Sequence, residues 1–202
     1  MIIFIEGCRN VGKTTLLSKF FEQNTNPNVI YYKFYFAKYI EEFGITKYDD
    51  GPGVHYFSIA NVLTILELNK TLFKDKVLIF DRSIFSAYTW SILRKRMDKQ
   101  SLLDEFEKIL NSQLYGDCAL MFLDKPESIS SNKSNRQKDY FDQFESYYKE
   151  KIIFKELFDR FGELINNPKK NNYFIEFENN FDNESIVKFI KLLSDLTSNL
   201  DK

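Results

Sequence analysis

Residues 7–14 carry the feature that most constrains this 202-residue chain, a Gly-Cys-Arg-Asn-Val-Gly-Lys-Thr segment with the spacing G-x-x-x-x-G-K-T. An apolar run precedes it, and a helical pattern starts at Lys13. In a strand–loop–helix of this kind, the loop N–H groups and the positive end of the helix dipole point at one position. The segment therefore predicts a phosphate-binding loop with a polyphosphate as its ligand.

Individual residues of this loop have distinct expected roles. Lys13 is expected to reach the β- and γ-phosphates as a point charge, and the Thr14 hydroxyl to coordinate a Mg²⁺ ion that bridges them. The nine residues predicted to hold the donor nucleotide are Gly7, Cys8, Arg9, Asn10, Val11, Gly12, Lys13, Thr14 and Thr15.

Composition and charge narrow the class of protein. With 44% hydrophobic residues, the chain can bury a large core as one domain over residues 1–202. A net charge of -1 supplies no global positive field for nucleic acid, so nucleic acid is not the expected partner. Small anionic substrates, which need only a local basic site, remain possible. Cys8 and Cys118 do not form a disulfide framework, and no signal peptide or membrane span is recognisable, so we expect a cytoplasmic protein.

Alternating strand and helix patterns predict the α/β class. β-branched and aromatic runs predict strands at 2–6, 29–35, 76–81, 118–124 and 172–177. Helical patterns lie at 13–24, 36–43, 54–73, 84–97, 101–112, 137–164 and 183–198. The alternation and the right-handed crossover rule together predict a five-stranded parallel sheet with helices on both faces.

A second chemical element, Asp81-Arg82, follows the third predicted strand. Ligands of such sheets bind at the carboxyl ends of the strands, so this pair is expected beside the phosphate loop. Asp81 is expected to orient Mg²⁺ through water, and Arg82 to clamp a phosphate or a phosphoryl group in transfer. The alternative is a surface pair that begins the next helix, with Ser83 as its N-cap.

These motifs resemble the thymidylate kinase and deoxynucleoside kinase family of P-loop phosphotransferases. The two specific segments are IEGCRNVGKTT and DRSIFSAY, and three supporting segments are GVHYFSIAN, FLDKPE and YFIEFENNFDNESIVKFI. The resemblance implies a three-layer P-loop NTPase fold, ATP and Mg²⁺ as cofactors, a homodimer, and a short basic lid at about 125–138. Lys133, Arg136 and Lys138 would supply the lid's positive charge.

The resemblance and the chemistry together define the expected site. Catalytic roles are expected for Lys13, Asp81, Arg82 and Arg136, and metal coordination for Thr14 and Asp81. The residues expected to bind the acceptor are Lys33, Phe34, His55, Ser58, Asn61, Val62 and Arg82.

Departures from the family pattern shape the expected substrate. Arg9 stands where thymidylate kinases usually carry a sugar-binding aspartate, and Ser58 and Val62 stand where an aromatic ring and an arginine read thymine. We therefore expect either relaxed selectivity among deoxynucleoside monophosphates or a preference for a base other than thymine. A free hydroxyl acceptor needs a general base, and the segment after the second strand offers none in the usual place, which favours a monophosphate acceptor.

The predicted activity is transfer of the γ-phosphoryl of ATP to a deoxynucleoside monophosphate. The alternatives are a deoxynucleoside kinase, or a kinase that acts on a modified base or on a polynucleotide end. A GTPase-type switch belongs to another class. It requires Asp-x-x-Gly and Asn-Lys-x-Asp segments, whereas this chain has DRSI at residue 81 and NKTL at residue 69.

Overall fold

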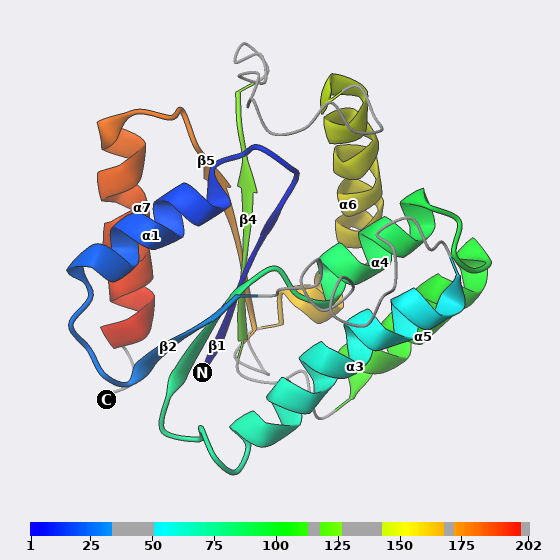
Figure 1. The fold of residues 1–202 in the computed structure, drawn as a ribbon, viewed down its shortest axis with the longest axis horizontal. Helices are drawn as coiled ribbons and strands as arrows, with labels where there is room; N and C mark the ends of the chain where they lie inside the picture. Colours follow the sequence, from blue (N-terminus) through cyan, green and yellow to red (C-terminus); the bar gives the residue numbers. More distant parts are fainter. Residues whose placement is uncertain (34–50, 113–117, 127–142, 168–171, 199–202) are drawn as a thin grey trace.

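A five-stranded parallel sheet forms the centre of the molecule (Figure 1). The computed structural model describes residues 1–33, 51–112, 118–126, 143–167 and 172–198. The strands are β1 (Ile2–Gly7), β2 (Val29–Lys33), β3 (Val77–Asp81), β4 (Cys118–Asp124) and β5 (Tyr173–Glu178), in the order β2-β3-β1-β4-β5. All four ladders are parallel, so the predicted fold class is confirmed.

Burial along the strands follows from their positions in the sheet. Every residue of β1 and β3 is buried, as is β4 up to its last residue, because helices cover both faces of a parallel sheet. The two edge strands, β2 and β5, are mostly half-buried or exposed. The continuous apolar runs at the centre are therefore the strongest strand signals in the sequence.

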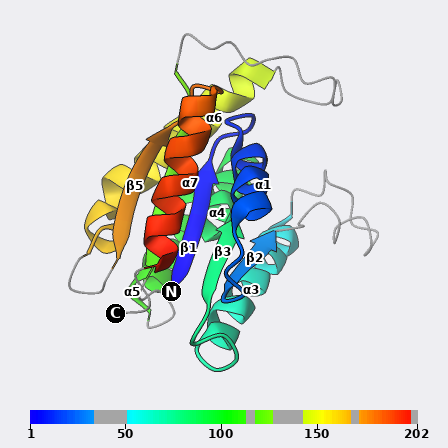
Figure 2. The ribbon, with the colours of Figure 1, turned by 90° about the vertical axis from the view of Figure 1, so that its left-hand side faces the viewer.

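Six described helices cover the two faces of the sheet. They are α1 (Lys13–Gln23), α3 (Pro52–Asn69), α4 (Ile84–Leu93), α5 (Lys99–Asn111), α6 (Gln143–Ile165) and α7 (Asn183–Ser198). α1 and α7 lie on one face, which Figure 2 shows from the front, and α3 to α6 lie on the other. The predicted helix at 36–43 and most of the predicted lid lie outside the described residues.

Two predicted helices end four residues earlier than the sequence pattern indicates. α4 ends at Leu93 and not at residue 97, because Lys95 has a positive φ of 51° and the Arg96 N–H donates to Ser91 O over 3.0 Å. This six-to-one bond is that of a Schellman motif, which terminates a helix. α3 begins at Pro52 and ends at Asn69. At its end the Lys70 N–H donates to Glu67 O and Leu68 O, and not to the carbonyl four residues back that would continue the helix.

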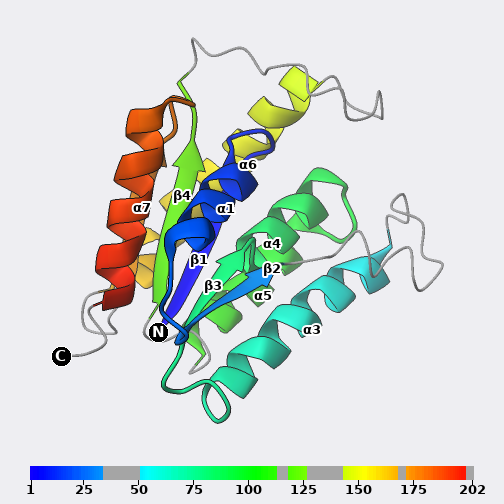
Figure 3. The ribbon, with the colours of Figure 1, turned by 60° about the vertical axis from the view of Figure 1, so that its left-hand side comes forward.

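The sheet brings the chemically interesting segments to one edge. Because all strands are parallel, their carboxyl ends meet there: the phosphate loop after β1, Asp81 at the end of β3, and Asp124 at the end of β4 (Figure 3). This is the edge at which open α/β sheets bind ligands. Within the described part of the chain, no helix is both long and apolar enough to cross a membrane.

Candidate active site

Two glycines allow the backbone conformation of the phosphate loop. Gly7 has φ 137° and Gly12 has φ 84°, which are values that side chains rarely tolerate. A Cβ atom at Gly7 would lie 2.2 Å from Leu123 O, and one at Gly12 would lie 2.4 Å from Asn179 Nδ2. The glycines therefore let the loop turn tightly against β4 and against the segment after β5.

Lys13 fills the centre of the loop with its ammonium group. Its Nζ donates to Gly7 O and to Cys8 O, each over 2.6 Å, and the side chain is buried. Burial, together with repulsion from Arg82, lowers the pKa of Lys13 from 10.5 to about 7. An anion placed beside this ammonium restores the favoured charged state, as a phosphate ligand would.

Thr14 and Asp81 meet beside Lys13. The Thr14 hydroxyl donates to Asp81 Oδ2 over 3.4 Å, and the Tyr31 hydroxyl donates to the same oxygen over 3.1 Å. One hydroxyl and one carboxylate suit Mg²⁺, which usually takes few protein ligands and completes its shell with phosphate oxygens and water. The described residues contain no group of three or more His, Cys, Asp or Glu side chains that could hold a metal by themselves.

Glu6 is a functional candidate to which the sequence analysis gave no role. It is fully buried at the end of β1, and its Oε1 accepts from Ser83 N and Ser83 Oγ, both over 2.7 Å, and from Ser86 N over 3.1 Å. Its Oε2 accepts from Ser86 Oγ over 2.5 Å. The carboxylate therefore fixes the start of α4 to the strand that carries the phosphate loop.

Arg82 is held in an unusual backbone conformation at this same junction. Its φ is 76°, its N–H donates to Ile5 O over 3.0 Å, and its Nη1 donates to Ser86 Oγ over 3.1 Å. A positive φ outside glycine is strained, and such strain is concentrated at functional sites. Ser83 is the N-cap of α4, as the alternative interpretation of this segment expected, because Ser83 Oγ accepts from Phe85 N over 3.4 Å.

Arg9 points from the phosphate loop toward α4 and α6. Its backbone N–H donates to Glu150 Oε2 over 2.9 Å, and its Nε lies 3.2 Å from Glu150 Oε1. Its guanidinium carbon lies 3.9 Å from the centroid of the Trp90 ring, a cation–π contact. The buried Glu150 carboxylate on α6 could not be predicted as a partner of the loop, because 141 residues separate it from Arg9.

The segment after β5 supports the loop from the opposite side. Asn179 is buried, its Nδ2 donates to Val11 O over 2.9 Å, and its backbone N–H donates to Asp124 O over 2.9 Å. No spacing in the sequence predicted this contact, because 168 residues separate Asn179 from Val11. Cys8 lies within the same packed region, and burial raises the pKa of its thiol to about 12.

The described residues that were expected to bind the acceptor have different surroundings. Lys33 ends β2 opposite Asp81 in the sheet register, whereas Phe34 lies outside the described residues, as does Arg136, which was expected to be a catalytic residue of the lid. His55 is fully buried, with Nδ1 2.8 Å from Ser91 Oγ and Nε2 3.4 Å from Glu105 Oε1. Burial lowers the pKa of His55.

The other acceptor candidates on α3 bond within the helix or join the core. Ser58 Oγ donates to Val54 O over 2.7 Å, and Asn61 Nδ2 donates to Phe57 O over 2.8 Å. Val62 has no exposed surface and belongs to the hydrophobic core. An arginine at residue 62 would therefore be buried among apolar side chains in this arrangement, at a high desolvation cost.

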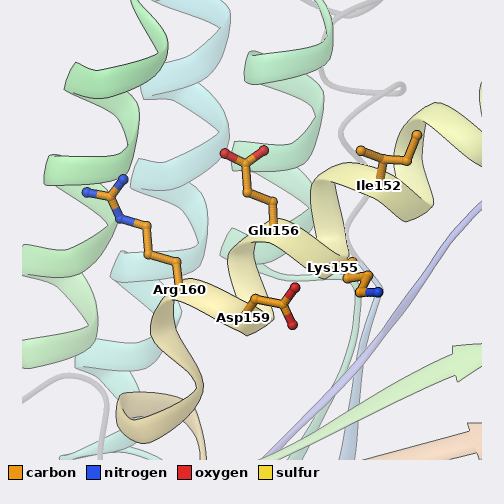
Figure 4. A pocket seen from close by; sticks show the side chains of 5 residues that line it. All are labelled: Ile152, Lys155, Glu156, Asp159 and Arg160. Carbon is orange, nitrogen blue, oxygen red and sulfur yellow. The ribbon is translucent and has the colours of Figure 1, made fainter.

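A surface hollow on α6 lies apart from these groups (Figure 4). Its lining side chains are Ile152, Lys155, Glu156, Asp159 and Arg160. Glu156 forms an ion pair of 2.7 Å with Lys99, and Arg160 lies 3.9 Å from Asp104, so these charges connect α6 to the region of α5. The hollow shares no residue with the phosphate loop.

Comparison with solved structures shows which fold this site belongs to. No protein-family model matches the sequence, and no curated protein sequence is similar enough to count as a relative. The thymidylate kinase from Ehrlichia chaffeensis superimposes with a TM-score of 0.60 at 18% identity, over 96% of this chain and 98% of the other. The thymidylate kinase from Candida albicans gives a TM-score of 0.59 at 17% identity, over 98% of this chain and 91% of the other.

A third similar structure is that of the NadR protein in complex with NR. It gives a TM-score of 0.64 at 16% identity over 98% of this chain, and this chain spans 51% of the NadR chain. Identities at this level show the fold alone. The predicted P-loop fold and the likeness to thymidylate kinases are therefore confirmed at the level of the fold.

Proposed function

We propose that this chain is a P-loop nucleotide kinase that transfers the γ-phosphoryl of ATP to a deoxynucleoside monophosphate, with Mg²⁺. The observation that carries the proposal is the meeting of Lys13, Thr14 and Asp81 at the carboxyl edge of the sheet. A buried ammonium, a hydroxyl and a carboxylate in this arrangement suit a triphosphate and its metal ion better than any other common ligand. The shared fold of the two thymidylate kinases supports the same class of reaction.

In the proposed mechanism the chain positions the reactants and balances their charge. Lys13 exchanges its two carbonyl partners for phosphate oxygens, and the loop N–H groups orient the same phosphates. Mg²⁺, held by Thr14 and Asp81, would supply Lewis-acid neutralisation of the phosphate charge. Arg82, fixed by Ser86, orients the acceptor phosphate beside the donor.

The choice of a monophosphate over a hydroxyl acceptor rests on the carboxylates at this edge. Asp81 bonds with Thr14 and Tyr31, and Glu6 is fully enclosed by the start of α4. Glu150 holds Arg9. Among the described residues, each of these three carboxylates already has partners, as does Asp124 at the end of β4. A hydroxyl acceptor needs an available general base. A phosphate acceptor is already nucleophilic and needs mainly cations.

A second candidate acceptor is the compound called NR in the NadR structure. That structure superimposes with a TM-score of 0.64, compared with 0.60 for the Ehrlichia chaffeensis thymidylate kinase. The deoxynucleosides remain the other alternative within the same reaction class. A basic lid at about 125–138 with Arg136, and a homodimer, remain parts of the proposal that rest on the family resemblance.

The test is a phosphotransfer screen with ATP and Mg²⁺. The acceptors are all ribo- and deoxynucleoside monophosphates, the matching nucleosides, NR and short oligonucleotides. We expect turnover to be highest with one or more deoxynucleoside monophosphates, and Lys13→Met to abolish it. Turnover with nucleosides or NR alone would replace the proposed acceptor, whereas no phosphotransfer to any acceptor would refute the kinase assignment.

A further inference from the structure

The carboxyl ends of β3 and β4 carry similar acid–base pairs on opposite sides of the phosphate loop. β3 and β4 are the two neighbours of β1 in the sheet. β3 ends in Asp81 followed by Arg82, and β4 ends in Asp124 followed by Lys125. Leu123 pairs with Gly7 in the ladder, so the second pair begins beside the first residues of the loop. Only the pair after β3 has a role in the mechanism described above.

Asp124 is fully engaged by groups other than the Lys125 ammonium. It accepts from the Tyr147 hydroxyl, and its Oδ2 lies 2.8 Å from Lys151 Nζ. Its Oδ1 also accepts from the backbone N–H of Lys125 over 2.9 Å. These bonds lower the pKa of Asp124, although burial opposes them, and they keep it ionised. The carboxylate therefore anchors α6 to β4 and balances the charge of Lys151.

Lys125 is a buried cation that forms no ion pair with a described carboxylate, although the Asp124 carboxylate is near enough to oppose the lowering of its pKa. Its side chain is only 5% exposed, and its Nζ lies 4.7 Å from the centroid of the Tyr147 ring. No ion pair to this ammonium is present in residues 1–33, 51–112, 118–126, 143–167 and 172–198. Burial lowers the pKa of Lys125, because a ring face compensates an ammonium only weakly.

This ammonium has no ion-pair partner among the described residues, and the strand that it follows borders the phosphate loop. Leu123, two residues before Lys125, pairs with Gly7 in the ladder, and Lys13 donates to the Gly7 carbonyl. The Asp124 carbonyl accepts from the Asn179 N–H, and the Asn179 side chain donates to Val11 O in the loop. The loop that would hold an oxyanion therefore has Lys13 at its centre and Lys125 after the strand that pairs with its first residue.

We propose that Lys125 binds the terminal phosphoryl group of the nucleoside triphosphate, from the side of the loop opposite Arg82. The inference rests on the proposed kinase function and adds a residue to it. Cations on both sides of a transferred phosphoryl group neutralise its equatorial oxygens in the transition state. Tyr147 positions the ammonium while Asp124 holds Tyr147 in place.

The test compares the binding of ATP and ADP by isothermal titration calorimetry, with Mg²⁺ and without acceptor. Lys125→Met should weaken ATP binding by about tenfold or more, which is the value of one charge-assisted contact, and leave ADP binding unchanged. The melting temperature should not fall, since the change removes a poorly compensated buried charge. Lys125→Arg keeps a cation and should bind ATP more tightly than the Met variant does.

Matched variants separate this inference from the proposed function. Lys155→Met removes an exposed lysine of α6 and should change neither affinity. Lys13→Met should weaken both ATP and ADP, and retention of both affinities in that variant would refute the nucleotide site itself. The role of Lys125 is tested when Lys13→Met has lost nucleotide binding. The role is wrong if Lys125→Met then keeps the normal affinity for ATP, and also if it weakens the binding of ATP and of ADP by the same factor.

Discussion

Replacing Glu6 by Gln is the perturbation for which the structure gives the most definite magnitude. The carboxylate has no exposed surface and accepts two backbone N–H and two hydroxyl hydrogen bonds from Ser83 and Ser86. Bonds to a charged acceptor are each worth about 1 kcal/mol more than bonds to a neutral one. The amide also presents an NH₂ group where Ser86 Oγ now donates, so that one bond must reverse its direction.

The expected loss follows from these four bonds. About 4 kcal/mol of weakened bonding is offset in part by the lower cost of burying an amide, which leaves a loss of about 2–3 kcal/mol in the free energy of unfolding. In a chain of this length, the melting temperature should fall by about 5–10 °C. Because Ser86 also anchors Arg82, the KM for the acceptor should rise at the same time.

The single tryptophan makes this measurable without a label. Trp90 lies on α4, the helix whose start Glu6 fixes, so urea unfolding can be followed by its fluorescence. Ser83→Ala is the matched control: it removes one of the four donors and should cost about 1 kcal/mol. Glu6→Gln within about 0.5 kcal/mol of the wild type would refute the idea that this carboxylate holds α4 to β1.

Three further predictions concern the phosphate loop. Lys13→Ala should lower kcat by at least about a hundredfold while circular dichroism stays native, and near-normal turnover would contradict the assigned role. The unfolded chain keeps the Lys13 proton to about pH 10.5 and the free folded chain releases it near pH 7. The contribution of Lys13 to the free energy of unfolding should therefore rise with pH between these two values. Urea unfolding at pH 7 and at pH 9 measures it, and the contribution should be absent in Lys13→Met. Arg9→Ala removes the ion pair to the buried Glu150 carboxylate together with the contact to Trp90 and should cost about 2 kcal/mol in urea unfolding. This loss should exceed that of Glu150→Gln, and the opposite order would rule out this account.

The strands and the donor loop could be predicted because their signals are local. The apolar runs of β1, β3 and β4 are continuous, and the Gly7 to Thr14 spacing requires one backbone shape. The meeting of Thr14 and Asp81 followed from parallel strands sharing one edge. Helix ends were less predictable, since the stop of α4 depends on Lys95 in a left-handed conformation that no glycine marks.

Contacts between distant segments could not be predicted from one sequence. Glu6 and Ser86 lie 80 residues apart, and Arg9 and Glu150 lie 141 apart, so no spacing rule connects them. The helical pattern of α3 likewise did not indicate which face of this helix packs against α4. His55 and Val62 were expected near the substrate, and the structure places both in the buried part of the helix layer.

The central place of β1 affects how the chain can assemble. β1 leaves the ribosome before both of its partners, because β3 and β4 begin at least 75 residues further along the chain. Pairing over such separations is slow, and unpaired apolar strands are prone to aggregate. During synthesis the apolar segment Ile2–Gly7 therefore has no partner on its β4 side until residues beyond Asp124 have emerged. A truncated product that ends before β4 should consequently be insoluble and unable to form the loop at Gly7.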